Sequence, residues 1–214
     1  NGTFPPAVNG RPRWGAGFEV GLFYSDHEKW NFGGSFKSEQ WFETFRYHSK
    51  DQIGRARELE LQFSLPSVFS FGVAYNAIEN TVIAADVRRF DYGHAELFGN
   101  SPDDGGLGWK SIWAAAVGVH YRFNEMLSAQ AGYLYNQNPI PDAATLFNIQ
   151  LPAINTNSVS GGITVALTDN VDIAGSAVYA FTHRNRGTLL EIPGTAIQMK
   201  QDLGTFSLGL RFRL

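Results

Sequence analysis

The chain has 214 residues, of which only 17% are charged, while 14% are aromatic and 23 residues are glycine. This composition is too rich in bulky apolar residues for a disordered chain, and no apolar run approaches the roughly 20 residues of a membrane-spanning helix. A net charge of -3 without a block of basic residues excludes a nucleic-acid partner, and the lack of cysteine excludes disulfide and thiolate chemistry.

Alternation of apolar and polar residues with a period of two recurs along the chain and predicts β-strands. It is clearest over residues 57–76, where leucine, phenylalanine, valine and tyrosine alternate with residues that include glutamate, glutamine and serine. Nine strands are predicted, in chain order: 13–24, 29–44, 57–76, 80–92, 110–123, 126–136, 156–168, 170–184 and 198–214. The predicted fold is all-β and antiparallel, with residues 1–214 in a single domain.

Short and long connections alternate between the predicted strands. Short turns are expected at 25–28, 77–79, 124–125 and Asp169, and long connections at 45–56, 93–109, 137–155 and 185–197. A transmembrane β-barrel has this asymmetry, with strands of about 9 to 11 residues or more, tight periplasmic turns and long extracellular loops. A soluble β-sandwich or lipocalin also alternates, so loop length alone leaves both classes open.

Aromatic residues gather toward both ends of the predicted strands. Those near the short turns are Tyr24, Trp30, Tyr75, Tyr121, Phe123 and Phe212. Those near the long connections are Trp14, Trp41, Phe42, Phe90, Trp113, Tyr133, Tyr135 and Phe181. Amphipathic rings favour the two interfaces of a membrane, whereas a soluble barrel has no reason to sort them. The pattern therefore favours a membrane barrel.

Three segments are similar to a known family. They are residues 65–92, the GLGWK run at 106–110, and PIP at 139–141 followed by TLFNI at 145–149. In order and spacing they resemble the FadL-type outer-membrane transporters of long-chain fatty acids and other hydrophobic compounds. The resemblance implies a 14-stranded barrel that crosses the Gram-negative outer membrane many times, an N-terminal hatch in the lumen, and a kinked strand that opens a lateral exit.

The sequence departs from that family in having nine predicted strands and no hatch, so it looks like the C-terminal part of such a barrel. Nine antiparallel strands cannot close with both chain ends in the periplasm. Unpaired strand edges in lipid would cost on the order of several kcal/mol per backbone group. A missing N-terminal barrel segment or a companion chain is therefore expected.

Sequence motifs of catalysis, cofactor binding and metal binding are absent. The five histidines lack HExxH spacing, and there is no GxSxG, Walker or dinucleotide motif. We therefore expect no catalytic residue, no cofactor and no metal. Asp103 and Asp104 could hold calcium, but a solvated turn explains them better. His120 is expected to be a hydrogen-bonded residue of the lumen.

Transport of an amphipathic acid needs an apolar path and a cation for its carboxylate. The candidate lumen cations are Arg88, which can pair with Asp86, and Lys110, Arg122, Arg211 and Arg213. Four bulky apolar residues in a predicted loop either line a hydrophobic entry groove or pack onto the barrel rim: Leu146, Phe147, Ile149 and Leu151.

The predicted function is passive uptake of hydrophobic small molecules, such as long-chain fatty acids, by a FadL-like lateral route. The expected partners are that ligand and outer-membrane lipid. Two alternatives remain open. A general porin for polar solutes would need a wide aqueous lumen, and an outer-membrane barrel lipase or protease would need Ser, His and carboxylate together at one rim.

Overall fold

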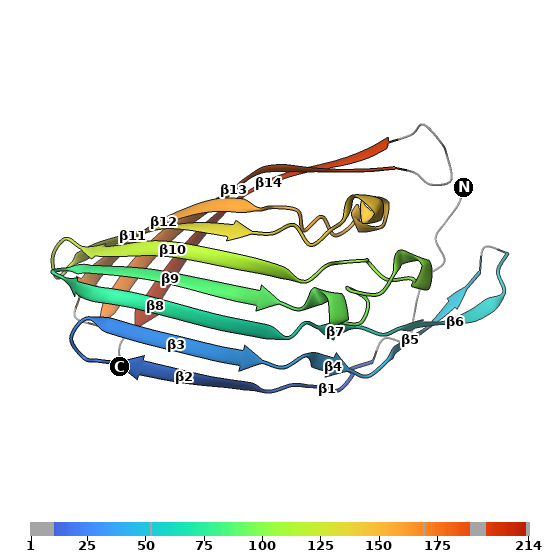
Figure 1. The fold of residues 1–214 in the computed structure, drawn as a ribbon, viewed down its shortest axis with the longest axis horizontal. Helices are drawn as coiled ribbons and strands as arrows, with labels where there is room; N and C mark the ends of the chain where they lie inside the picture. The colour runs from blue at the N-terminus through green and yellow to red at the C-terminus, as the bar shows by residue number, and fades with distance from the viewer. Residues whose placement is uncertain (1–10, 52, 169, 189–195, 213–214) are drawn as a thin grey trace.

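The computed structural model describes residues 11–212, apart from 52, 169 and 189–195, and it is an all-β structure. One antiparallel sheet of nine strands has the order β14-β13-β12-β11-β10-β9-β8-β3-β2. The strands are β2 Glu19–Ser25, β3 Trp30–Lys37, β8 Val68–Ile78, β9 Thr81–Phe90, β10 Ile112–Arg122, β11 Leu127–Asn136, β12 Asn157–Thr168, β13 Val171–Thr188 and β14 Ala196–Phe212. The predicted fold class and number of strands are confirmed (Figure 1).

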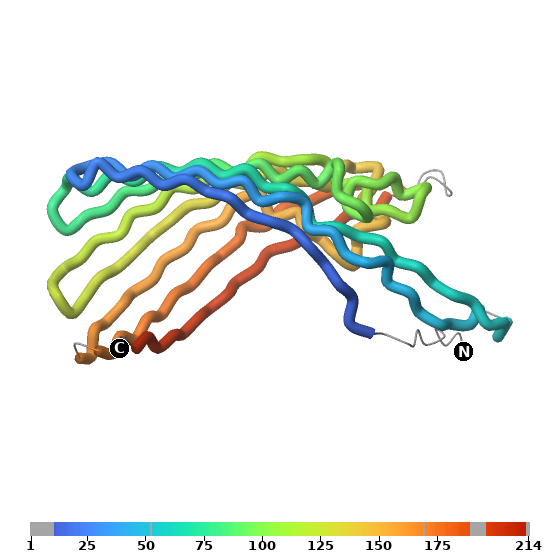
Figure 2. The backbone as a smooth tube through the Cα atoms, turned by 90° about the horizontal axis from the view of Figure 1, so that it is seen from below, coloured from blue at the N-terminus to red at the C-terminus, as the bar shows by residue number. Residues whose placement is uncertain are grey.

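The sheet curves into an arch, which Figure 2 shows along its side. Strands β2 and β14 lie at the two ends of the order, and within the described residues each pairs on one side only, with β3 and β13. The nine strands are therefore the curved wall of an open barrel. No helix of the described residues is long and apolar enough to span a membrane.

Short turns gather at one end of the arch and long connections at the other, as predicted (Figure 1). The β2–β3 turn is tight because the Asp26 carboxylate accepts the backbone N–H groups of Glu28, Lys29 and Trp30 at 2.7 to 2.9 Å. The predicted turn at Asp169 lies outside the described residues. We call the two ends of the barrel the turn end and the loop end.

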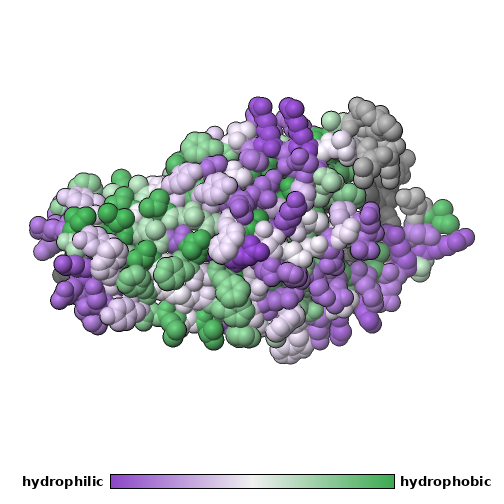
Figure 3. Space-filling view, viewed as in Figure 1, coloured by the Kyte–Doolittle hydropathy of each residue, from purple (hydrophilic) through white to green (hydrophobic). Residues whose placement is uncertain are grey.

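Alternation sorts the side chains between the two faces of the arch. On β8, the outward Phe69 and Phe71 are more than half exposed, whereas Ser70 and Gly72 line the lumen beside Arg88 and Asp86 of β9. Hydrophobic side chains cover the outer face along most of the strands, and hydrophilic ones concentrate at the loop end (Figure 3). This is the surface expected of a barrel wall in contact with lipid.

The strands are more broken near the loop end than the sequence predicted. Residues 13–24, 29–44 and 57–76 were each expected to be one strand, but each is interrupted. The short pieces β1 Gly15–Ala16, β4 Gln40–Phe42 and β7 Ser64–Leu65 form a separate sheet. One break falls at Pro66, which has no backbone N–H to donate to a neighbouring strand.

Residues 45–56 were predicted to be a long connection without strands, and this prediction was wrong. These residues belong to a two-stranded hairpin, β5 Phe45–Lys50 and β6 Ala56–Leu61, that projects beyond the loop end (Figure 2). The hairpin is anchored at its base by stacking of Phe63 against Phe42 and Phe45. The connection predicted at 185–197 is also shorter, because β13 continues to Thr188 and β14 begins at Ala196.

Phe90 does not belong to the outer aromatic girdle at the loop end. Its backbone pairs with that of the buried residue Ile112 of β10, and both residues line a cavity on the inner side of the sheet. The ring of Phe90 stacks on that of Tyr92 with centroids 5.9 Å apart. Phe90 has the same parity along β9 as the lumen residues Asp86 and Arg88, so the alternation of the strand places its ring on the inner side.

Candidate functional site

Two long connections pack against each other at the loop end, and together we call them the loop cap. The first spans residues 91–111 and the second residues 137–156. Each contains two short 3-10 helices: η1 Tyr92–His94 and η2 Pro102–Asp104 in the first, η3 Asp142–Ala144 and η4 Leu146–Asn148 in the second. The backbone N–H of Lys110 donates to the carbonyl of Pro139 at 2.8 Å, which joins the two connections.

The loop cap has a small hydrophobic core of its own. Trp109, Ile140, Ala144 and Ile154 are buried together, and Met199 of β14 completes the cluster. The rings of Tyr92 and Phe98 pack against Trp109 with centroids 5.0 Å away in both cases. Because Met199 belongs to the barrel wall, this core fastens the loop cap to the sheet.

Asn148 lies at the centre of the loop cap and is fully buried. Its Oδ1 accepts a hydrogen bond from the indole Nε1 of Trp109 at 2.5 Å, and its Nδ2 donates to the carbonyls of Leu107 and Ala144, both at 2.8 Å. One amide side chain thus satisfies groups in both connections, which would otherwise be buried without partners.

The extension of β13 holds the loop cap from the other side. The Nδ2 of Asn185 donates to Thr145 Oγ1 at 3.0 Å, and Thr145 Oγ1 donates to the carbonyl of Asp142 at 2.7 Å. At Gly187 an added Cβ would lie 2.4 Å from that same carbonyl, so only glycine permits this approach. The helical turn η3 is therefore pressed against the barrel wall.

The four apolar loop residues are exposed rather than packed onto the rim. Their exposed fractions are 37% for Leu146, 47% for Phe147, 50% for Ile149 and 47% for Leu151. We call these four side chains the apolar loop patch. Thr145 and Asn148, which lie among them in the chain, are completely buried. Residues 145–149 therefore expose their apolar side chains and bury their polar ones.

A cavity of about 290 Å³ lies against the inner side of the loop cap. Aromatic walls come from Phe90, Tyr92 and Trp109, and Ile112, Pro139 and Pro152 add apolar surface. Burial of the Tyr92 ring raises the pKa of its hydroxyl above the ordinary value. We call this space the loop cavity.

Two of the candidate cations are engaged in ion pairs within the lumen. Arg88 Nε lies 2.9 Å from Asp86 Oδ1, and Arg211 Nε lies 2.7 Å from Oδ2 of Asp172, whose residue is only 1% exposed. The suggested pairing of Arg88 with Asp86 is confirmed. These guanidinium groups neutralise carboxylates of the wall.

Arg122 and Lys110 have no ion-pair partner among the described residues. Arg122 lines a hollow of about 300 Å³ at the turn end of the lumen, which His120 and Arg211 also line. Lys110 was expected in a strand, and this was wrong, because it precedes β10 and lies in the loop cap. Arg213 lies outside the described residues. His120 has the expected lumen position, although no described residue hydrogen-bonds its ring.

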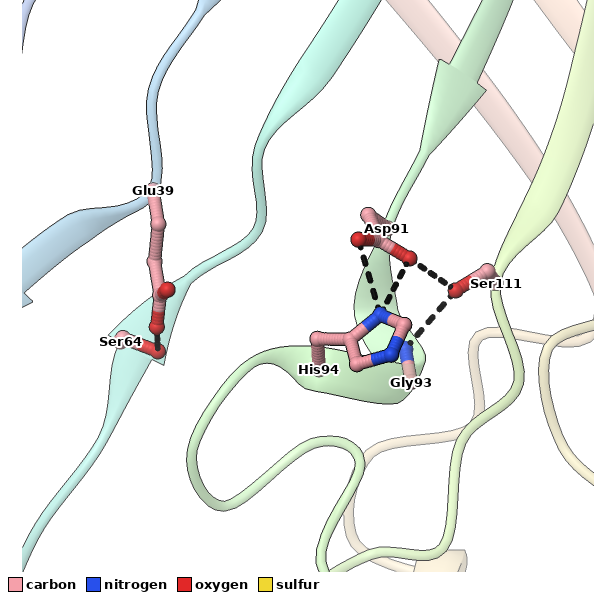
Figure 4. A network of polar contacts seen from close by, with 6 residues as sticks. All are labelled: Glu39, Ser64, Asp91, Gly93, His94 and Ser111. Carbon is pink, nitrogen blue, oxygen red and sulfur yellow. Dashed lines mark hydrogen bonds and ion pairs between the residues drawn. The ribbon is translucent and has the colours of Figure 1, made fainter.

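Ser, His and carboxylate side chains do meet at one point of the rim, as Figure 4 shows. Ser111 Oγ donates to Asp91 Oδ1 at 2.6 Å, and His94 Nδ1 lies 2.9 Å from Asp91 Oδ2. A hydrolytic triad needs the histidine between serine and carboxylate, where it takes the serine proton. Here the carboxylate lies between the other two groups, so the cluster lacks the arrangement that a lipase or protease would need.

The Asp91 cluster instead holds the start of the loop cap. Ser111 Oγ accepts the backbone N–H of Gly93 at 3.0 Å while donating to Asp91. The hydrogen bond from Ser111, followed by the contact with His94, holds the pKa of the Asp91 carboxyl below its ordinary value. Both ends of the first connection are therefore tied together by an ionised carboxylate.

Ser64 of β7 joins the broken strands to the loop cap, and Figure 4 shows its contact with Glu39. Fully buried Ser64 donates its hydroxyl proton to Glu39 and accepts the backbone N–H of Glu96 at 2.8 Å. Within the described residues no group of His, Asp and Glu has a metal-binding arrangement. Asp103 and Asp104 lie in η2, where Ser101 Oγ accepts the N–H of Asp103 at 3.3 Å, as in a solvated turn.

Three amide side chains of this site were not identified from the sequence: Asn148, Asn155 and Gln201. Asn148 lies between apolar residues of a loop, and the other two border the loop cavity. The sequence marked the buried position of Asn148 in one way only: this polar residue stands among three large apolar residues of the TLFNI motif.

The comparisons with known proteins agree with this geometry. A family model described as "Outer membrane protein transport protein (OMPP1/FadL/TodX)" matches residues 9–205. The comparison with curated proteins found no match.

Three solved structures illustrate the shared fold. The toluene transporter TodX of Pseudomonas putida is 16% identical with a TM-score of 0.58, over 91% of this chain and 48% of TodX. The toluene transporter TbuX of Ralstonia pickettii is 15% identical with a TM-score of 0.58, over 94% of this chain and 48% of TbuX. A FadL homologue of Pseudomonas aeruginosa is 14% identical with a TM-score of 0.68, over 92% of this chain and 52% of the homologue.

The chain spans about half the length of these structures. Sequence identities this low show only that the fold is shared. Membership of a family is shown by the family model, which covers most of the chain. The resemblance of the three sequence segments is therefore confirmed, and the chain belongs to the OMPP1/FadL/TodX family of Gram-negative outer-membrane transport proteins.

Proposed function

We propose that this protein is a passive outer-membrane channel for hydrophobic small molecules and that it captures them at the apolar loop patch. The captured molecule then moves into the lumen beneath the loop cap and leaves sideways into the bilayer. Long-chain fatty acids and monoaromatic hydrocarbons are the candidate substrates, because FadL and toluene transporters are the relatives of known fold.

The observation that carries the proposal is that residues 145–149 expose their apolar side chains and bury their polar ones. Leu146, Phe147 and Ile149 face water, whereas Asn148 between them is buried with all its amide groups hydrogen-bonded. Exposing such side chains forgoes about 1.5 to 3 kcal/mol for each that could have been fully buried. A loop that is locked in this orientation is suited to bind an apolar molecule from the water outside.

The alternatives find less support in the same region. A porin for polar solutes would not need an apolar loop patch, because its solutes are hydrated. A barrel hydrolase would need a histidine hydrogen-bonded to the serine, and His94 Nδ1 instead contacts both carboxylate oxygens of Asp91, one of which accepts the Ser111 hydroxyl proton. We therefore propose transport without catalysis.

The edges of β2 and β14, which have no pairing partner among the described residues, support a second proposal, that strands from outside residues 11–212 close the barrel. Backbone groups at an open edge in lipid cost several kcal/mol each, on the order of a lost buried hydrogen bond. These strands belong either to a longer form of the chain or to a companion chain. Single cysteines placed on β2 and β14 of this cysteine-free chain would report, by cross-linking, what lies beside each edge.

The transport proposal is tested by the double substitution Leu146→Ser and Phe147→Ser. Uptake of a fluorescent fatty acid and of toluene into vesicles that contain the protein should fall several-fold, because the apolar surface for capture is lost. Gln150→Ser, in the same exposed loop, is the matched control and should leave uptake unchanged. Unchanged uptake by the double variant, with the barrel shown to be folded by its heat-modifiable gel mobility, would contradict capture at the patch.

A further inference from the structure

The loop cavity is lined by uncharged residues. Phe90, Tyr92 and Trp109 form its aromatic walls, and no Asp, Glu, Lys, Arg or His of the described chain lines it. A carboxylate in this space would lack a cation, and an ammonium group would lack an anion. Burial of an unpaired charge costs far more than burial of a neutral polar group, so the cavity favours neutral molecules.

Two side-chain oxygens at the border of this cavity have no hydrogen-bond partner. They are Oδ1 of Asn155, which precedes β12, and Oε1 of Gln201 in β14. Both atoms are buried, neither accepts a hydrogen bond from any described residue, and both residues line the loop cavity. Such orphaned acceptors are rare in folded proteins and carry the desolvation penalty of a missing hydrogen bond.

Both oxygens can turn toward a molecule in the cavity. The terminal torsion of Asn and Gln side chains has a broad, shallow energy profile, so the amide rotates at little cost. A hydroxyl group at the cavity wall would then donate to an oxygen that otherwise has no partner. A hydrocarbon of the same size would leave both oxygens unsatisfied.

We infer that the loop cavity is a binding site for small neutral molecules that join an apolar body to a hydroxyl donor, such as phenols and short alcohols. This inference rests on the proposed function and specifies one substrate class of the channel. The side-chain oxygen of Asn155 or of Gln201 accepts the single hydroxyl proton, while Phe90, Tyr92 and Trp109 surround the apolar body.

The size of the cavity agrees with this class. A cavity of about 150 Å³ is enough to hold benzene. The loop cavity, at about 290 Å³, accommodates one substituted ring or a short alkyl chain. The long alkyl chain of a fatty acid would extend beyond it.

The test compares phenol with toluene, which have nearly the same shape but differ in the hydroxyl group. Binding of each is measured by titration calorimetry on the protein in lipid nanodiscs, with empty nanodiscs as the blank. The variants are Asn155→Leu and Gln201→Met, which keep the side-chain size and remove the acceptor. Gln62→Met, in the segment between β6 and β7 away from the cavity, is the matched control.

The measured quantity is the ratio of the toluene Kd to the phenol Kd. Loss of the accepting oxygen should lower this ratio by about 5- to 100-fold, because phenol loses its partner and toluene no longer leaves an acceptor unsatisfied. The control should keep the ratio of the unmodified protein. The ratio should fall in at least one of the two single variants, and in the double variant whichever oxygen accepts the proton.

Two failures can be told apart. If both compounds bind and the ratio is the same in Asn155→Leu, Gln201→Met and the unmodified protein, the hydroxyl site is wrong and the channel proposal stands. If neither compound binds to the unmodified protein, and the fluorescent fatty acid is not taken up, the proposed function itself is wrong.

Discussion

The indole Nε1 of Trp109 donates a 2.5 Å hydrogen bond to Oδ1 of Asn148, across 39 residues of sequence. This bond joins the two connections of the loop cap beneath the apolar loop patch. Since the patch can present apolar side chains to water only while the residues below it stay fixed, this pair is the natural place to test the rigidity of the entry site.

Asn148→Leu should loosen the loop cap without unfolding the barrel. The substitution leaves the Trp109 indole N–H and the carbonyls of Leu107 and Ala144 without their partner, at about 1 to 3 kcal/mol for each buried group. Hydrogen exchange of backbone amides at 107–109 and 144–149 should accelerate, while amides of β10 and β11 stay protected. Gln150→Leu, on the exposed side of the same loop, should change neither, and equal exchange in both variants would contradict the role of Asn148.

Lipid contact of the outer face predicts opposite outcomes for neighbouring residues of β10. Val117 lies outward at the middle of this strand, and Ala116 lies on the lumen side, paired with Asp86. Val117→Lys should destabilise the barrel by about 2 to 4 kcal/mol, as found for a lysine at the bilayer midplane. Ala116→Lys should be tolerated beside the Asp86 carboxylate.

Urea unfolding of the two lysine variants in phospholipid vesicles measures this difference. Equal stabilities would show that the two faces of β10 meet the same environment. That result would contradict the assignment of the convex face to lipid.

The strands could be predicted from the sequence because a period of two is a local pattern. Phe69 and Phe71 point outward and Ser70 inward, as that pattern requires. The hairpin at 45–61 was missed although Phe45 and Tyr47 alternate with Arg46 and His48, because a loop was expected between every second pair of strands.

The site was harder to predict because its contacts are distant in sequence. The exposed residues Leu146 and Phe147 could be picked out as unusual for a loop. The burial of Asn148 and of the side-chain oxygens of Asn155 and Gln201 could not, since it depends on segments far apart in the chain coming together, such as Trp109 and Asn148, which are 39 residues apart. An amide in a loop is ordinarily exposed, and nothing local marks the buried ones.

Acid should weaken the start of the loop cap through Asp91. Its pKa is held below the ordinary 3.8, first by the hydrogen bond from Ser111 and then by His94. Because the folded-state pKa is the lower one, the stabilisation is complete above the ordinary value and is lost as the pH falls through the folded-state pKa.

Ser111→Ala separates this effect from general acid unfolding. The variant should open the loop cap more readily than the unmodified protein near neutral pH, and this difference should shrink as the pH falls below about 4. Hydrogen exchange at the Trp109 amide, which donates to Phe98, provides the measurement. His94→Ala should produce a smaller difference, since that side chain is 85% exposed, and a difference that does not vary with pH would contradict a role for the Asp91 charge.

Fatty acids, if they are substrates, should depend on Arg122 more than on Arg88. Arg122 has no ion-pair partner among the described residues, whereas Arg88 is paired with Asp86 at 2.9 Å. A guanidinium without a partner is available to a ligand carboxylate, and a charged hydrogen bond of this kind contributes about 1.5 to 3 kcal/mol. Arg122→Gln should therefore weaken binding of a long-chain fatty acid by about 10- to 100-fold.

The matched substitution Arg88→Gln should have a smaller effect on the same binding, since the carboxylate of Asp86 already occupies that guanidinium. A neutral hydrocarbon such as toluene has no carboxylate and should bind equally to both variants and to the unmodified protein. If toluene and the fatty acid weaken together in Arg122→Gln, the residue shapes the lumen instead of recognising the carboxylate, and the hydrophobic body of the ligand alone determines what this channel accepts.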